Sequence, residues 1–143
     1  MAAGLDAAVR ALGAGRLVGY PTDTLYGLAA TAGDPAAVDR VYAAKRRPPA
    51  EPLSVAVSSW EEIEGLARLS PSSRAFVRRH LPGPYTVLLP PAPRAPLAPP
   101  LLASGSLGIR IPDHPLAREL ARRAGPITAT SANLHGRAPI TTR

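Results

Sequence analysis

The stretch Gly19-Tyr20-Pro21-Thr22-Asp23-Thr24-Leu25-Tyr26-Gly27-Leu28 decides how this 143-residue chain is expected to fold. Residues 16–20 form a short, weakly alternating apolar run, which predicts a buried strand, and Pro21 lacks the amide donor that regular pairing needs. Thr22, Asp23 and Thr24 then place polar groups at the carboxyl end of that strand, where open α/β sheets usually bind ligands. The same residues also suit a turn whose side chains cap the local backbone.

Apolar spacing and turn signals divide the rest of the chain into alternating helices and strands. The expected helices cover residues 5–12, 35–45, 60–66, 71–80 and 115–124. Short runs typical of strands cover residues 16–20, 53–57, 85–89, 107–111 and 127–130. This alternation predicts a single α/β domain. Residues 90–100 hold six prolines in eleven positions, so we expect an extended linker on the surface there, and not a central strand.

Composition narrows the class of protein. The chain has no cysteine, so it has no disulfide or thiolate metal site. It has no apolar run of about eighteen residues, and its amino terminus lacks the basic flank of a signal peptide, so we expect a cytoplasmic protein without membrane contact. No group of Asp, Glu and His has the spacing of a protein-held metal site. A Walker A loop and a GxGxxG fingerprint are both absent from the sequence.

The net charge of +7 is concentrated in the second half of the chain. Residues 1–60 carry 6 basic and 5 acidic side chains, whereas residues 61–143 carry 11 and 5. Such a surplus attracts nucleotide phosphates or RNA, and it is equally typical of an arginine-rich chain of biased genomic composition. Of the 17 basic residues 16 are arginine, so Lys45 is the only lysine.

Three groups of polar residues are candidates for a binding site. Lys45, Arg46 and Arg47 follow a predicted helix and precede two prolines, a pattern that suits a triphosphate and also a solvated, dipole-favoured helix end. Ser131 and Asn133 follow the last predicted strand, where they suit either phosphate and ribose oxygens or the capping of a turn. Arg110 lies inside an apolar strand, so it is expected to emerge into a cleft, find a partner or reach solvent at the edge.

Five segments follow one another along the chain: Pro21-Thr-Asp-Thr-Leu-Tyr-Gly-Leu28; Lys45-Arg-Arg-Pro48 with Pro52-Leu53; Pro82-Gly-Pro-Tyr-Thr86; Gly108-Ile-Arg-Ile-Pro112 with His114-Pro115; and Thr130-Ser-Ala-Asn133 with Gly136. Together they resemble the Sua5/YciO/YrdC family, the threonylcarbamoyl-adenylate synthases that begin t6A modification of tRNA. The resemblance runs from about residue 11 to 142. It implies an α/β fold with a twisted mixed sheet and flanking helices, in one domain over residues 1–143 that is expected to be short at its carboxyl end.

The resemblance also implies roles for particular residues. Lys45, Arg47, Ser131 and Asn133 match the family's catalytic and ATP-binding signature, and Ser106 falls near the nucleotide by the same alignment. Thr22 and Arg110 match positions that hold the threonine substrate. Two positions depart from the family's pattern: Glu51 stands where many relatives carry a cation, and His135 stands where relatives usually have serine.

The implied activity is a nucleotidyltransferase reaction in which L-threonine, bicarbonate and ATP give threonylcarbamoyl-AMP and pyrophosphate. Mg²⁺ would be held mainly by the ATP phosphates, and the downstream t6A transferase machinery would use the product. The alternative is a non-catalytic RNA-binding module that contacts tRNA, although 4% aromatic residues predict no stacking surface for bases. The related carbamoyl-transfer domains of hydrogenase maturation factors are disfavoured because they usually belong to longer, cysteine-bearing proteins.

Overall fold

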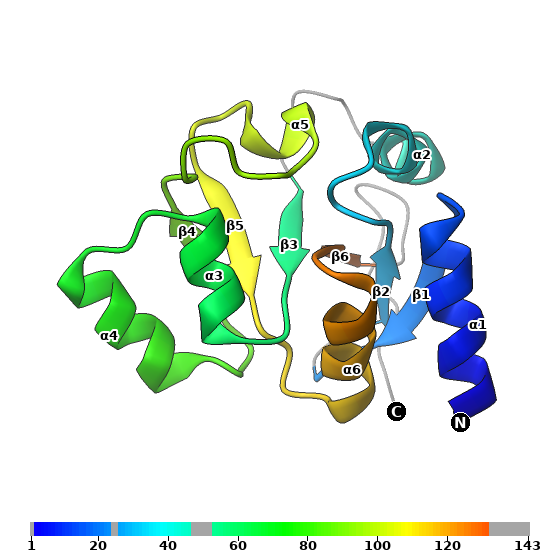
Figure 1. Ribbon diagram of the computed structural model, residues 1–143, viewed down its shortest axis with the longest axis horizontal. Helices are drawn as coiled ribbons and strands as arrows, with labels where there is room; N and C mark the ends of the chain where they lie inside the picture. The colour runs from blue at the N-terminus through cyan, green and yellow to red at the C-terminus, as the bar shows by residue number, and fades with distance from the viewer. Residues whose placement is uncertain (1, 24–25, 47–52, 132–143) are drawn as a thin grey trace.

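In the computed structural model of the chain, residues 2–23, 26–46 and 53–131 are described (Figure 1). The elements of the described part are α1 (Ala2–Gly13), β1 (Val18–Pro21), β2 (Tyr26–Ala29), α2 (Pro35–Lys45), β3 (Ser54–Ala56), α3 (Trp60–Leu66), α4 (Pro71–His80), β4 (Val87–Leu89), α5 (Pro99–Leu102), β5 (Leu107–Arg110), α6 (Pro115–Ala124) and β6 (Ile127–Ser131). Helices and strands are interleaved along the chain, with two strands in succession at β1 and β2 and two helices in succession at α3 and α4.

The strands form one six-stranded sheet in the order β1-β2-β6-β3-β5-β4. Among the pairs of described strands, the β3–β5 pair is parallel and the other four are antiparallel. The last strand, β6, pairs with β3 through its first three residues and with β2 through its last two, so it joins the two halves of the sheet. The prediction of a mixed sheet with flanking helices is confirmed.

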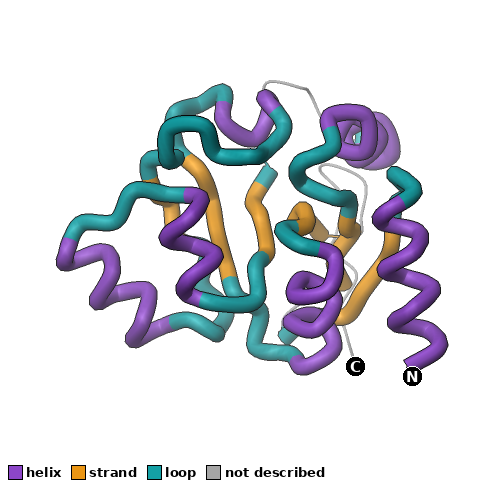
Figure 2. The backbone as a smooth tube through the Cα atoms, in the orientation of Figure 1, coloured by secondary structure: helices purple, strands orange, loops and turns teal. Residues whose placement is uncertain are grey.

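Two hydrophobic clusters lie on opposite faces of the sheet, because side chains alternate along each strand. On one face, Val55 and Ile109 pack among residues of α2, α3, α4 and α5. On the other face, Tyr20, Ala56 and Ile127 pack among residues of α1 and α6, which lie side by side (Figures 1 and 2). This second cluster has no member from β4 or β5 in the described part. The described helices therefore cover the second face of the sheet over one half only.

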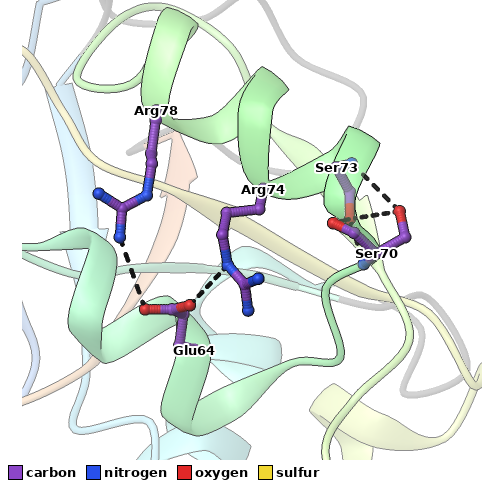
Figure 3. A network of polar contacts seen from close by, with 5 residues as sticks. All are labelled: Glu64, Ser70, Ser73, Arg74 and Arg78. Atoms are coloured by element: carbon purple, nitrogen blue, oxygen red, sulfur yellow. Dashed lines mark hydrogen bonds and ion pairs between the residues drawn. The ribbon is translucent and has the colours of Figure 1, made fainter.

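Local capping explains where the helices begin. The Asp34 carboxylate accepts hydrogen bonds from the amides of residues 36 and 37 at the start of α2. Ser70 and Ser73 form a reciprocal capping box at the start of α4 (Figure 3). In the same view, Glu64 of α3 pairs with Arg74 and Arg78 of α4 and so links these two helices at the surface.

Strand β2 is the main element that the sequence patterns do not predict. We expected Pro21 to stop regular pairing, but Pro21 is the last residue of β1 and lies opposite Tyr26 of β2. Strand β1 is at the edge of the sheet, and an edge strand tolerates proline because one of its sides needs no donor. The stretch 19–28 is therefore a pair of antiparallel strands with its polar residues between them.

The expectation of a surface linker at residues 90–100 is wrong. Ala95, Leu97 and Ala98 are buried in the first cluster, and the short helix α5 begins at Pro99. The Ala98 amide donates to the carbonyl of Ala32 at 2.9 Å, and other backbone bonds tie the segment to residues 66 and 68. Proline lacks a donor but keeps its carbonyl, so the alanines and leucines between the prolines can still donate and pack.

Candidate functional site

An ion pair joins the polar loop after β1 to the end of β5. Nη2 of Arg110 lies 2.5 Å from Oδ1 of Asp23, and both side chains are 13% exposed. The same nitrogen donates to the carbonyl oxygen of Gly83 at 3.3 Å. Asp23 and Arg110, which are 87 positions apart in the sequence, thus contact each other beside a third segment, the loop between α4 and β4. The expectation that Arg110 finds a partner is confirmed, and the partner is a carboxylate.

Thr22 lies directly beside this pair. It is the residue before Asp23, and its side chain is buried, with 8% of the residue exposed. Tyr20, on the preceding strand, donates from its phenol to the carbonyl oxygen of Thr128 at 3.2 Å. Burial raises the pKa of Tyr20 well above its ordinary range, and the charge of Arg110 partly offsets this rise. Tyr20 therefore stays neutral near Arg110. Because Thr22 is next to Asp23, which pairs with Arg110, the fold brings the two proposed threonine-binding residues, Thr22 and Arg110, together.

Gly108 and Arg110 share one face of β5, because residues two apart along a strand point the same way. Ser106 directly precedes the strand. Gly108 lies opposite Leu88 of β4, and a Cβ at residue 108 would stand 2.7 Å from Oγ of Ser54. This is the face that α1 and α6 leave uncovered over β4 and β5, and Leu88 is 69% exposed there. Ser106, just before β5, and Arg110, the last residue of β5, are at opposite ends of the strand.

Lys45 is the last residue of α2, so the prediction that it stands at a helix end is confirmed. The residue is 3% exposed, whereas the next residue, Arg46, is exposed and adopts a left-handed conformation with φ of 53°. A cation at this place is favoured by the carbonyl end of the helix. Arg47, Glu51 and the rest of the following loop lie outside the described residues.

Ser131 is the last residue of β6 and lies opposite Gly27 of β2. Gly27 has no room for a side chain, because a Cβ there would stand 2.7 Å from the ring of Tyr20. The Tyr20 ring thus lies across the β2 backbone at the place where β6 ends. Asn133 and His135 lie outside the described residues, so the second half of this predicted motif is not placed.

Other polar side chains have structural roles in the described part. His114 caps α6 by accepting from the amide of Leu116 at 3.2 Å. His80 ends α4 and contacts the rings of Phe76 and Tyr85, with centroids 4.2 and 5.2 Å away. The low aromatic content of the sequence gives no indication of this surface cluster.

Sequence reasoning missed two groups at the ion pair. Asp23 was identified only as part of a polar stretch, and the carbonyl oxygen of Gly83 was not considered. An arginine between two isoleucines of a strand signals that a carboxylate is needed nearby. The sequence offers several acids, and only the fold selects Asp23.

The family model of Sua5/YciO/YrdC proteins, described as telomere recombination, matches residues 10–143. The chain belongs to the Sua5/YciO/YrdC family. The threonylcarbamoyl-AMP synthase of Bacillus subtilis is 42% identical over 124 residues, which are 85% of this chain and 36% of that protein. A relative from Methanocaldococcus jannaschii is 41% identical over 128 residues, which are 90% of this chain and 59% of that protein.

The fold agrees with solved structures of the family. Pyrococcus abyssi Sua5 complexed with L-threonine superposes with a TM-score of 0.88 at 34% identity, over 95% of this chain and 40% of that one. This chain of the Sua5/YciO/YrdC family thus spans less than two thirds of each of these three relatives. Among the helices of the described part, none is long and apolar enough to cross a membrane.

Proposed function

We propose that this chain carries threonylcarbamoyl-AMP synthase activity. The threonine amine forms a bond to the carbon of carbon dioxide derived from bicarbonate, with loss of water overall, and gives a carbamate. A carbamate oxygen then attacks the α-phosphorus of ATP, and the bond from that phosphorus to the bridging oxygen breaks to release pyrophosphate. Such a reaction needs positioning and charge stabilisation more than acid-base chemistry.

The observation that carries the proposal is the meeting of Thr22, Asp23 and Arg110 at the end of β1 and β5. A guanidinium suits the carboxylate of an amino acid, because it presents several donors in a planar fork. The adjacent threonine hydroxyl, which both donates and accepts, suits the polar groups of the same ligand. Pyrococcus abyssi Sua5, whose structure holds L-threonine, is similar over 95% of this chain.

ATP would lie along the uncovered face of β5, from Ser106 toward Arg110. Lys45 and Arg47 would meet its phosphates, and Ser131 and Asn133 would contact phosphate or ribose oxygens. Among the described residues, no group of three or more His, Cys, Asp or Glu has the arrangement of a metal site. Mg²⁺ would be bound mainly through the phosphate oxygens of ATP, where it would neutralise charge on the leaving pyrophosphate.

The test is pyrophosphate release from ATP by the 143-residue chain, with threonine and bicarbonate each present or omitted. The proposal predicts release only when all three substrates are present. Arg110→Ala should raise the threonine KM by about tenfold or more, with little change in the ATP KM. The matched control is Arg118→Ala, an exposed arginine on α6. Release that does not depend on threonine, or an effect of Arg110→Ala confined to ATP, would contradict the proposal.

RNA binding is a second candidate function, and the surface ring cluster favours it. Phe76 and Tyr85 are both exposed, and they flank His80. Arg79 is exposed on the same helix, α4. Exposed rings beside an arginine can stack bases and contact phosphate. We expect an unmodified tRNA anticodon stem-loop to bind weakly, with affinity that falls steeply as salt rises.

Phe76→Ala should weaken that RNA binding, whereas Ala75→Ser on the same helix should not. Equal affinity of all three proteins for the stem-loop would remove the ring cluster from the RNA site. In the synthase proposal the protein acts in the cytoplasm and passes its product to the downstream t6A transferase machinery. Retained pyrophosphate release in Phe76→Ala would show that the two functions use separate surfaces.

A further inference from the structure

The Arg110 guanidinium is held by groups from two different loops. Its Nη2 atom donates both to Oδ1 of Asp23, at 2.5 Å, and to the carbonyl oxygen of Gly83, at 3.3 Å. Arginine has a long side chain with several rotatable bonds, so two fixed acceptors on one nitrogen restrict the orientation of its planar head. Of these two acceptors, the Asp23 carboxylate is charged and the Gly83 carbonyl oxygen is neutral.

Asp23 is itself held in place by the fold. It follows β1 within two residues, and β1 is fixed to β2 through four paired positions. Its side chain is only 13% exposed, so water screens the pair weakly, and the attraction between the two charges is correspondingly strong. A carboxylate fixed in this way can set the direction in which a neighbouring guanidinium points.

The pair also changes what kind of ligand the site would accept. Asp23 neutralises Arg110 locally, so a purely anionic ligand gains less there than it would beside an unpaired arginine. A carboxylate carries one negative charge, whereas a phosphate group carries up to two, so a partly neutralised guanidinium matches the carboxylate better. The geometry therefore favours an amino-acid carboxylate over a phosphate at this end of β5.

We propose that Asp23 is a positioning residue that orients Arg110 toward the carboxylate of the amino-acid substrate. This inference rests on the proposed synthase function. Asp23 acts through Arg110, so replacing Asp23 changes the binding of threonine, and leaves the binding of ATP largely as it is.

Two measurements test the inference on the full 143-residue chain. The first is ¹⁵N relaxation of the Arg110 Nε–H group, without substrate, in the unaltered protein and in Asp23→Asn. Asparagine keeps the shape and removes the charge, and the expected result is a more mobile Arg110 side chain in the variant. Equal order of Arg110 in both proteins overturns the inference. Asp39→Asn, which changes an exposed carboxylate on α2, is the matched control.

The second measurement is calorimetric titration of threonine and of ATP into Asp23→Asn, Arg110→Ala and the double variant. Asp23→Asn should weaken threonine binding by about tenfold and ATP binding by less than about twofold. The double variant should bind threonine no more weakly than Arg110→Ala. Effects that add fully overturn the inference, since Asp23 would then contact threonine itself.

Thermal melts of each variant accompany these titrations. If Asp23→Asn fails to fold, Asp23→Glu, which keeps the negative charge, is measured in its place. An ordered Arg110 in the folded Glu variant supports the inference, and a disordered Arg110 overturns it. Absence of threonine binding by the unaltered chain would overturn the proposed function and this substrate role with it. The relaxation result would still show separately whether Asp23 orders Arg110.

Discussion

Gly27→Ala should destabilise the protein because Tyr20 occupies the space that a side chain would need. A Cβ at residue 27 would stand 2.7, 2.8 and 3.0 Å from three atoms of the Tyr20 phenol. Tyr20 is buried, and its phenol is bonded to the carbonyl oxygen of Thr128, so the ring has little freedom to move. Overpacking of this kind costs about 1–3 kcal/mol, which lowers the Tm of a chain of this size by roughly 2–10 °C.

Gly19→Ala is the matched control on the neighbouring strand. The nearest atom to a Cβ at residue 19 is the carbonyl oxygen of Gly27, at 4.0 Å, and neither glycine has a positive φ. Its free energy of unfolding should change by less than about 0.5 kcal/mol. Denaturant melts of both variants, and of Gly27→Ala combined with Tyr20→Ala, check the reasoning. If Gly27→Ala costs as much without the ring as with it, the ring is not the cause.

Three further predictions concern the end of α2 and the helices α3 and α4. Lys45→Met keeps the buried stem and removes the charge, so the variant should fold and bind ATP more weakly by about 1.5–3 kcal/mol. Arg46→Ala, at an exposed residue, should change ATP binding little, and calorimetry compares the two variants. Ser70→Ala removes the cap of α4 and should cost about 1 kcal/mol in a denaturant melt. Glu64→Ala breaks pairs whose side chains are 34% and 47% exposed, so the same melt should show less than about 1 kcal/mol.

Local sequence patterns predict most of the helices and strands, but not those that depend on distant partners. Apolar spacing and proline at the first turn place α2, α4 and α6 within about a residue or two of their observed bounds. The sequence does not predict strand β2, because Gly27 and Pro21 are typical of turns when their neighbours in the sheet are unknown. Residues 90–100 were misplaced because proline content alone does not show which alanines and leucines between the prolines are buried.

The candidate site was only partly predictable for a similar reason. The end of β1, the end of α2 and the end of β5 are local features, and each drew attention to the residues at that place. Which of these ends meet depends on the strand order, and the order β1-β2-β6-β3-β5-β4 contains crossovers that no local pattern specifies. Asp23 could therefore be identified as polar and well placed, but its partner could be identified only from the fold.

The pair of Asp23 and Arg110 places two charges in a nearly buried position, and the desolvation that this requires leads to a last prediction. Two opposite charges lose hydration when they are buried, so apolar residues of similar volume often replace such a pair without loss of stability. Removing one partner is different, because the remaining charge is left buried. Asp23→Leu alone should therefore cost about 3–5 kcal/mol, whereas Asp23→Leu with Arg110→Met should cost less than about 1 kcal/mol. Denaturant melts measure both values, and threonine titration of the double variant should show no binding. If the double variant were as unstable as Asp23→Leu alone, the pair would be needed for the fold. A stable double variant that fails to bind threonine would instead assign the pair to substrate binding.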